Sequence, residues 1–401
     1  MRGIWPTKVL GEVCQLISGQ HIDAKDYNTQ GRGVGYLTGP SDFGAVNPLI
    51  TKWTEHPKVK AKRGDVLITV KGSGVGKINL LDEAEVAISR QLMAIRVIGA
   101  DPRFVHAILS STFDHFQALS TGAAIPGISR DQVLGLPIPL PPLPEQQRIV
   151  AILDEAFDGI ATAKANAEKN LQNARAIFES HLQSVFSQRG PGWVTLEIGA
   201  VAEIYDGPHA TPKTVEKGPL FLGISALQDG KINLGETRHV TPDDFKHWTR
   251  RVTPQTDDVV FSYETRLGQA AIIPSGLSCC LGRRMGLVRA NREKMSPLFF
   301  VYQYISPPFR EFLNSRTVRG ATVDRIPLKD FPSFPISLPT LDEQERLGER
   351  FESIRAQTEI LTSIYERKRA ALDALKKSLL HRAFAGELTA DKTSELIEAV
   401  A

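Results

Sequence analysis

Residues 72–77 read Gly72-Ser-Gly-Val-Gly-Lys77 and come nearest in this sequence to a phosphate-binding loop. Such a loop ends in Gly-Lys followed by Ser or Thr, whose hydroxyl binds magnesium. Here the glycine spacing is one residue short, and Ile78 stands where the hydroxyl is needed. A dinucleotide-binding turn is also disfavoured, because no strand–helix–strand pattern surrounds the run. We therefore expect a hairpin turn.

A second run, Ser306-Pro-Pro-Phe309, has the Ser/Asn/Asp-Pro-Pro-aromatic pattern of amino-methyltransferases. Such an enzyme also needs a glycine-rich cofactor loop in a parallel sheet, and no stretch upstream of Ser306 has that context. The histidines and cysteines do not fall at metal-ligand spacing. We predict that this chain has no catalytic residues and binds no metal or cofactor of its own.

Basic and polar residues in predicted loops are better suited to contact DNA. Arginine pairs with guanine, and glutamine with adenine, through two hydrogen bonds each, whereas Lys and Arg on phosphates supply affinity. Each candidate could equally be a surface ion pair or part of a structural turn. The candidates are His21, Lys25, Lys71, Arg90, Gln91, Thr121, Gly122 and Arg130 in the first half, and His209, Lys213, Arg266, Arg283, Arg284, Arg319, Gly320 and Thr322 in the second.

The candidates fall at matching places because the chain repeats itself. At the start of each half the offset is 188 residues, which aligns Trp5 with Trp193 and His21 with His209. Further on it is 193 residues and then 198. Three framework matches at these offsets are Asp65 with Asp258, Arg96 with Arg289, and Leu136-Pro-Ile-Pro-Leu with Phe334-Pro-Ile-Ser-Leu. Arg250 and Arg251 lie in a stretch that differs between the halves, and could read bases or be solvated surface.

Each half begins with a β-rich segment and ends with a long helical one. Residues 65–70 and 258–263 are short β-type runs, and proline-rich segments at 137–144 and 332–339 close the β-rich parts. The segments that follow have no proline up to Gln188 or beyond Asp342. Each could form a helix of about 40 residues, roughly 60 Å long.

The helical segments carry apolar residues at alternating steps of four and three, the pattern of a coiled-coil seam. The alternative is two separate helices that each pack on their own domain. We favour a shared coiled coil, because a helix of this length extends beyond a domain of about 140 residues. The expected seam includes Ile149, Leu153, Ile160, Leu347, Phe351, Ile354, Leu361, Leu372 and Leu375.

These observations predict an α+β protein with four segments. A first β-rich domain spans residues 1–143, and a first long helix spans 144–190. The second domain spans 191–341, and the second helix with a C-terminal tail spans 342–401. Two similar domains held by helices suit a protein that binds at two places.

The composition is that of an ordinary globular protein. Apolar residues make up 42% and charged residues 23%, and the net charge of +3 permits a nucleic-acid partner without requiring one. No apolar run approaches the roughly 18 residues of a membrane helix, and the first residues lack the apolar core of a signal peptide. Cys14, Cys279 and Cys280 form no disulfide framework. A cytoplasmic location is therefore expected.

The duplicated order resembles the specificity subunit of type I restriction–modification systems. The residues that carry the resemblance are Leu140-Pro-Pro-Leu-Pro-Glu-Gln-Gln-Arg148, Leu338-Pro-Thr-Leu-Asp-Glu-Gln-Glu-Arg346 and Ser378-Leu-Leu-His-Arg-Ala-Phe-Ala-Gly-Glu-Leu388. The match spans nearly the whole chain. It implies that the two helices form an antiparallel coiled coil between two target-recognition domains, each reading one half of a bipartite, asymmetric DNA site.

The resemblance also implies partners and places the chemistry in them. Two adenine-N6 methyltransferase subunits, which use S-adenosylmethionine, would dock on the helices. Restriction subunits, which use ATP and magnesium, would join through them. The sequence leaves open a methylation-only or type IIB-like system, a single-chain methyltransferase using residues 306–309, and a scaffold with no DNA role.

Overall fold

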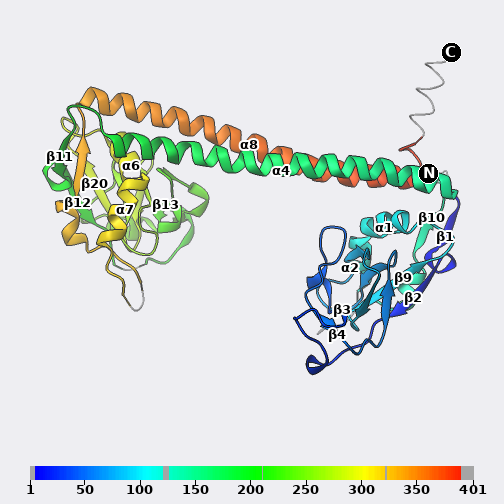
Figure 1. Ribbon diagram of the computed structural model, residues 1–401. Coiled ribbons are helices and arrows are strands. Elements are labelled where there is room, and N and C mark those ends of the chain that lie inside the picture. Colours follow the sequence, from blue (N-terminus) through cyan, green and yellow to red (C-terminus); the bar gives the residue numbers. More distant parts are fainter. Residues whose placement is uncertain (1–4, 121–125, 210, 321–322, 390–401) are drawn as a thin grey trace, which may run out of the picture. The chain divides into compact units, whose positions relative to one another are not determined.

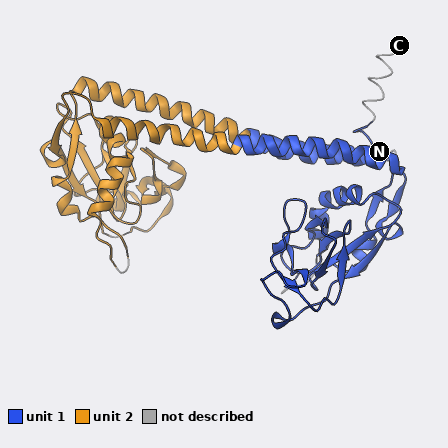
Figure 2. Ribbon diagram, in the orientation of Figure 1, with its two compact units in different colours: residues 1–167, 368–401 blue, residues 168–367 orange. Residues whose placement is uncertain are grey.

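The structure is a computed structural model that describes residues 5–120, 126–209, 211–320 and 323–389. The chain divides into two compact units (Figure 2). Unit 1 comprises residues 1–167 and 368–401, and unit 2 comprises residues 168–367. The boundary falls within both long helices, α4 (Leu143–Gln188) and α8 (Leu341–Ala385). Each unit therefore holds one β-rich domain and part of each long helix.

The described part of the domain in unit 1 is built on two sheets and a strand pair (Figure 1). The order β2-β9-β6-β7 is antiparallel throughout, whereas β3 and β8 run parallel in the order β4-β3-β8-β5. β1 pairs with β10. The strands are β1 (Thr7–Val9), β2 (Cys14–Ser18), β3 (Val34–Leu37), β4 (Trp53–Thr54), β5 (Lys60–Lys62), β6 (Val66–Thr69), β7 (Ile78–Leu80), β8 (Glu85–Ile88), β9 (Leu92–Val97) and β10 (Pro137–Pro139).

The domain in unit 2 repeats the first of these sheets. Its order β12-β20-β17-β18 matches β2-β9-β6-β7 strand for strand, and β11 pairs with β21 as β1 pairs with β10. The other described strands form the sheet β16-β13-β19 and the pair β14-β15. The bounds are β11 (Val194–Glu197), β12 (Ala202–Asp206), β13 (Val215–Leu222), β14 (Leu227–Gln228), β15 (Lys231–Ile232), β16 (Arg238–His239), β17 (Val259–Ser262), β18 (Ala270–Ile272), β19 (Cys279–Leu281), β20 (Met285–Ala290) and β21 (Pro335–Leu338).

Short helices cover the repeated sheets. Asp101 and Ser296 cap the equivalent helices α1 and α6, and each is followed by proline at the first helical position, where a missing N–H costs nothing. The helices are α1 (Pro102–Ser111), α2 (Phe113–Leu119), α3 (Arg130–Leu134), α5 (Pro242–Trp248), α6 (Pro297–Ile305) and α7 (Pro307–Arg316). The 3-10 turns are η1 (Leu10–Glu12), η2 (Ala24–Asp26), η3 (Pro40–Asp42), η4 (Ile198–Ala200), η5 (Ile224–Ala226), η6 (Leu234–Glu236) and η7 (Leu328–Ser333).

The two long helices run antiparallel within each unit. In unit 1, Lys376 of α8 lies over the ring of Phe157, and about two turns further along α4 the Lys164 Nζ is 2.6 Å from Asp373 Oδ1. In unit 2, Arg175 pairs with Glu366 at 3.3 Å, and α4 ends against Phe351. The predicted α+β fold with an antiparallel helix pair is confirmed.

The predicted seam is correct in part. Ile149, Leu153, Ile160, Leu347 and Phe351 are buried, and Ile354 and Leu372 are half-buried. Leu361 and Leu375 were expected in the seam and are instead exposed, at 36% and 46%. In the last turns of α4 the buried positions are Leu182 and Phe186. An ideal helix turns about 20° per heptad away from a strict seven-residue repeat, so relative to Leu347 the predicted positions have turned by about 40° at Leu361 and about 80° at Leu375.

The core of each unit joins its domain to its helices. In unit 1, Phe104 and Ile108 of α1 pack in one cluster with Ile149 and Leu153 of α4 and with Leu380 of α8. The corresponding cluster in unit 2 is rich in aromatic rings and contains Phe186 of α4, Phe299 of α6 and Phe351 of α8 among its buried members. Each domain is therefore continuous with the helix pair in its own unit.

Candidate nucleic-acid interface

Three loops of unit 1 leave the repeated sheet at the same end. β2 finishes with Ser18 opposite Met93, and β6 finishes with Thr69 opposite Leu92, the first residue of β9. The backbone N–H of Gly19 donates to the Leu92 carbonyl at 3.1 Å. The segments after β2, after β6 and before β9 are thus brought together, although they are about 50 and 20 residues apart in sequence.

The predicted contacts of the first half lie on these segments. Their side chains are all exposed, and each lies on a loop or at the end of a helix or strand. His21 and Lys25 follow β2, Lys71 follows β6, Arg90 and Gln91 precede β9, and Arg130 begins α3. A bridge between Lys71 and Gly127 and a hydrogen bond from Ile128 N to Val70 O bring the segment before α3 to the same end. Thr121 and Gly122 lie outside the described residues.

Two of these loops are held by contacts within the domain. The Lys58 Nζ donates to the His21 carbonyl oxygen at 2.9 Å, and His21 Nε2 is 3.4 Å from Asp23 Oδ1. Gln91 lies against Gly39, where an added Cβ would come 2.3 Å from its Oε1 atom. The amide end of the Gln91 side chain therefore lies directly over the backbone of Gly39.

Unit 2 has the same convergence. β12 finishes with Asp206 opposite Gly286, and β17 finishes with Ser262 opposite Met285. The Gly207 N–H donates to the Met285 carbonyl at 2.9 Å, as Gly19 does to Leu92 in unit 1. The offset of 188 residues therefore aligns positions that are structurally equivalent in the two units.

The predicted contacts of the second half fall into two groups, those held by hydrogen bonds or ion pairs within the domain and those that are exposed. Arg266 donates from Nη1 to the Ile224 and Ser225 carbonyls at 3.2 and 3.1 Å, and Arg284 pairs through Nε with Glu264 Oε2 at 2.8 Å. Both guanidinium groups therefore hold loops of the domain. His209, Lys213, Arg283, Arg319 and Gly320 are exposed, while Thr322 lies outside the described residues.

The segment that carries Arg319 returns to the same sheet end. Val318 and Arg325 exchange backbone hydrogen bonds at 2.8 and 3.2 Å, and Arg325 also bridges to Glu264 beyond β17. Arg319 and Gly320 thus follow directly after a backbone-paired position. The segment is positioned close to the turn at Arg283.

A cavity of about 420 Å³ opens beside the end of β12 in unit 2. Its wall combines one carboxylate, Asp206, with imidazole, indole and guanidinium groups. The Tyr263 hydroxyl donates to Asp206 Oδ1 at 3.0 Å, and burial together with that carboxylate raises the pKa of Tyr263. The wall is formed by Asp206, Gly207, Pro208, His209, His247, Trp248, Arg250, Arg251, Val252 and Leu281.

Sequence reasoning missed two members of this wall, His247 and Trp248. They lie at the end of α5, whose start is marked by Thr241, an N-cap whose hydroxyl accepts from Asp244 N at 3.1 Å. The cap and the following proline could have predicted the helix. Nothing in the local pattern indicated that the helix end would meet the loop after β12.

Equivalent ion pairs stiffen the sheet in both units. Arg96 binds Asp65 with two nitrogens, at 3.0 and 2.7 Å, and Arg289 binds Asp258 in the same way at 2.9 and 2.7 Å. Both carboxylate side chains are only 4% exposed. The acidic residue and the arginine that the repeat aligned thus form a bidentate pair in each domain.

The glutamine of each Glu-Gln-x-Arg motif has a structural role. In unit 1, Gln146 is 2% exposed; its Oε1 accepts from the N–H of Asp101 and its Nε2 donates to the Pro141 carbonyl, both at 2.8 Å. Asp101 is the N-cap of α1. The side chain therefore ties the start of α4 to the first helix of the domain.

Gln344 makes the same connection in unit 2. Its Oε1 accepts from the N–H of Ser296, the N-cap of α6, at 2.9 Å, and its Nε2 donates to the carbonyls of Pro339 and Lys294 at 2.9 and 3.1 Å. The motif that recurs in the sequence is thus a recurring joint between domain and helix.

The runs that resembled enzyme motifs serve the fold. The expected hairpin turn at residues 72–77 is confirmed between β6 and β7, with Gly76 N donating to Thr69 O at 2.9 Å. Ser306 is fully buried as the N-cap of α7; its hydroxyl donates to the Gln303 carbonyl at 2.6 Å and accepts from Phe309 N. In the described residues no group of three or more His, Cys, Asp or Glu side chains is placed to hold a metal.

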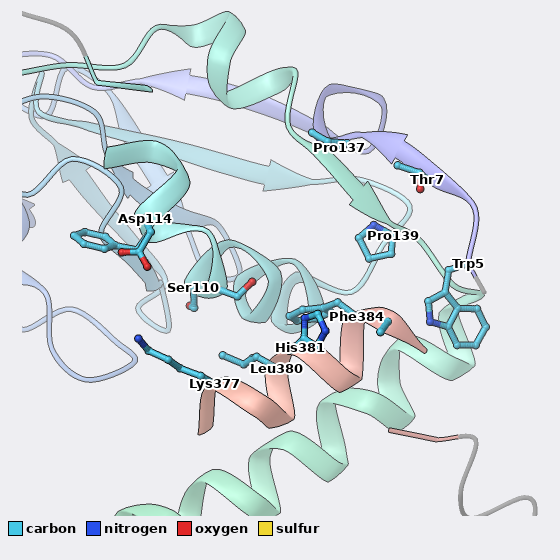
Figure 3. A pocket seen from close by; sticks show the side chains of 13 residues that line it. Trp5, Thr7, Ser110, Asp114, Pro137, Pro139, Lys377, Leu380, His381 and Phe384 are labelled. Atoms are coloured by element: carbon cyan, nitrogen blue, oxygen red, sulfur yellow. The ribbon is translucent and has the colours of Figure 1, made fainter. Parts of the chain in front are cut away.

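A larger cavity, about 710 Å³, lies in unit 1 between the β1–β10 pair and the last turns of α8 (Figure 3). Thr7, Pro139, Lys377 and Phe384 contribute to its wall. Unit 2 has a smaller counterpart of about 300 Å³ at its own helix end and strand pair. These cavities belong to the joints between helix and domain, and the candidate DNA contacts are on other segments.

None of the helices in the described part of the chain combines the length and apolar character needed to cross a membrane. Each of the two matching β-rich domains presents basic loops at one end of its sheet, an arrangement suited to a protein that contacts DNA through two domains.

Comparison with known proteins supports this class. The family described as type I restriction modification DNA specificity domain matches residues 4–172 and 192–367. The chain therefore belongs to this family.

Curated relatives include two proteins of Methanocaldococcus jannaschii. The putative type I restriction enzyme MjaX specificity subunit is 30% identical over 175 residues, which are 43% of this chain and only 40% of that relative. The type I restriction enzyme MjaVIII specificity subunit is 22% identical over 348 residues, 82% of this chain and 80% of the relative.

Two solved structures share the fold. One, from work on complex assembly and conformational transition of the type I R-M system, has a TM-score of 0.76 at 23% identity and covers 97% of this chain and 99% of its own. The HsdS subunit from Thermoanaerobacter tengcongensis has a TM-score of 0.62 at 21% identity, with 96% and 97% covered.

Proposed function

We propose that this chain is the DNA-reading subunit of a type I restriction–modification complex, and that each domain reads one half of a bipartite, asymmetric site. The observation that carries the proposal is the repeated sheet end. In both units the same three segments converge on a framework held by the same Asp–Arg pair, yet aligned positions on these segments carry different residues, such as Lys71 against Glu264 and Gln91 against Arg284. A shared framework with different exposed side chains suits two readers of different base sequences.

The chemistry belongs to other chains in this proposal. Adenine-N6 methyltransferase subunits, using S-adenosylmethionine, dock on the helices, and restriction subunits with ATP and magnesium join through them in the cytoplasm. The chain itself supplies recognition and no active site. Exposed apolar side chains on α8 support docking: Ile360, Ile364 and Leu375 are 61%, 42% and 46% exposed. Apolar surface of this kind on a long helix is expected to be covered by a partner.

Domain exchange tests the two-reader proposal. Replacing residues 1–140 by the corresponding domain of another family member should change one half of the methylated-adenine motif in the host genome and leave the other half unchanged. The reciprocal exchange of residues 191–338 should change the opposite half. An unchanged motif, or a change in both halves after a single exchange, would contradict the proposal.

The isolated chain provides the control for catalysis. Incubated with S-adenosylmethionine and DNA but without partner subunits, it should bind duplex in a salt-dependent manner and transfer no methyl groups. Methyl transfer by the chain alone would contradict the proposal that this chain has no active site.

A further inference from the structure

The carboxylate of Asp206 is the centre of a polar network at the end of β12. Its Oδ1 accepts from the Tyr263 hydroxyl at 3.0 Å. Its Oδ2 lies 2.8 Å from His209 Nε2 and 3.9 Å from Arg251 Nη1. A carboxylate fixed by a tyrosine and a histidine keeps a defined position beside the arginine, so the arginine has a fixed partner toward which its guanidinium is drawn.

Arg251 differs from the neighbouring arginines in what its guanidinium contacts. Arg266 and Arg284 are taken up by loop carbonyls and by Glu264, and Arg250 donates from Nε to the His247 carbonyl at 3.2 Å. The side chain of Arg251 is 67% exposed and faces the cavity. Most of its donors are therefore directed to solvent or to a ligand.

The network is specific to the second domain. By the offsets of the repeat, Asp206 corresponds to Ser18 and Tyr263 to Val70, neither of which could hold an arginine in this way. The framework pairs, in contrast, are kept in both domains. A side-chain arrangement that is present in only one of the two domains is expected to contribute to the recognition of that domain's own half-site.

We propose that Arg251 reads the edge of a guanine in one half-site, with Asp206 as its positioning residue. This inference rests on the function proposed above. Guanine offers two acceptors, N7 and O6, in the major groove, and these match the parallel donors of a guanidinium. A phosphate is disfavoured, because the Asp206 carboxylate beside the arginine repels an anion and tolerates a neutral base edge. The 3.9 Å ion pair with Asp206 draws the exposed guanidinium towards the cavity before DNA arrives, which reduces the entropy lost on binding.

The test uses the chain assembled with its methyltransferase subunits and S-adenosylmethionine. The methylation motif of the wild-type complex is determined first. Initial rates are then measured on duplexes that carry each single base-pair change in the site, at several salt concentrations. The variants are Arg251→Ala, Arg251→Lys, Asp206→Asn and the double variant Arg251→Ala with Asp206→Asn. Arg292→Ala is the matched control, since it also removes an exposed arginine paired with an aspartate in unit 2.

Arg251→Ala should reduce discrimination at one G·C pair by about 10- to 100-fold and leave the other half-site unaffected. Lysine should not restore it, because an ammonium lacks the paired donors. Asp206→Asn should give a smaller loss that disappears in the Arg251→Ala background, since Asp206 acts through the arginine. Arg292→Ala should behave as the wild type.

Two results would overturn the inference and leave the proposed function intact. One is a uniform loss of rate on all duplexes with a salt dependence reduced by about one ion, which identifies a phosphate contact. The other is unchanged discrimination in Arg251→Ala. A wild-type complex that methylates no bipartite site would overturn the proposed function, and this inference with it.

Discussion

The two units use the same interactions to hold each sheet to its helix and different interactions at the sheet end. Asp65–Arg96 and Gln146 in unit 1 have exact counterparts in unit 2. The segments after β2 and β12 both begin with a glycine that donates to the neighbouring strand, but the Asp206–Tyr263 hydrogen bond beside the second has Ser18 and Val70 at the aligned positions of unit 1. The contacts that recur maintain the repeated architecture, and the contacts that differ between the units are the candidates for reading different DNA sequences.

The units also differ in the length of the helix pair that each domain contacts. In unit 1 the contacts include an Arg103–Asp154 ion pair and an edge-to-face contact between Phe104 and Phe384. Unit 2 adds polar contacts further along the helices: Lys231 to Glu359 at 3.2 Å and Arg310 to Glu179 at 3.3 Å. These outer pairs are largely exposed, so each contributes little to stability, but together they restrict the orientation of the second domain.

The largest effect should come from removing the shared carboxylates. Asp65→Ala and Asp258→Ala each leave a partly buried arginine without its partner and a backbone N–H, of Lys62 or Gln255, without its acceptor. Each should lower the free energy of unfolding by about 3 kcal/mol. Urea denaturation measures the loss, and hydrogen exchange shows whether it is confined to the mutated unit. Clearly unequal losses would show that the two pairs are not equivalent.

A smaller effect is expected from the motif glutamines. Gln344→Ala removes three hydrogen bonds and Gln146→Ala removes two, all at buried positions, so the losses should be about 3 and 2 kcal/mol at most. The exposed neighbour Gln147 is the matched control, and its replacement by Ala should change stability by less than about 0.5 kcal/mol. A greater loss at Gln146 than at Gln344 would contradict the hydrogen-bond count.

The smallest effect is the pH dependence that His106 of α1 contributes to the stability of unit 1. Burial and the nearby Lys376 lower the pKa of His106 to about 4, and the equivalent position in α6 is Val301. In the unfolded chain His106 binds a proton near pH 6.5, whereas in the folded chain it stays neutral until the pH approaches 4. The free energy of unfolding therefore keeps its full value above pH 6.5 and decreases as the pH falls towards 4. The loss should reach at most about 2 kcal/mol for a partly buried group.

The substitution His106→Val tests this pH dependence, because it introduces the residue found at the equivalent position of the second domain. The melting temperature of the variant should fall less than that of the wild type between pH 6.5 and 4.5. Identical pH profiles for the two proteins would show that His106 is equally protonated in the folded and unfolded chains.

The sequence was sufficient to predict the repeat, because framework residues recur at fixed offsets and the structure pairs them as aligned. The alignment placed the candidate contacts at corresponding positions, but their convergence at one end of the sheet depends on strand pairing that the sequence did not indicate. The exposed positions of Leu361 and Leu375 were missed, because a heptad pattern was extended over more turns than a nearly straight helix permits. The cavity wall was missed in part, because α5 is far in sequence from the loop after β12.

Unit 2 is one continuous stretch of chain, whereas unit 1 is completed by residues on both sides of it. Leu380 and Ala383 of α8 are buried against residues of the first domain, so that core lacks part of its surface until the second half of the chain has emerged from the ribosome. During synthesis the later-made domain can finish folding before the earlier one. A nascent chain arrested before residue 380 should therefore expose the apolar side of α1 to proteases and chaperones.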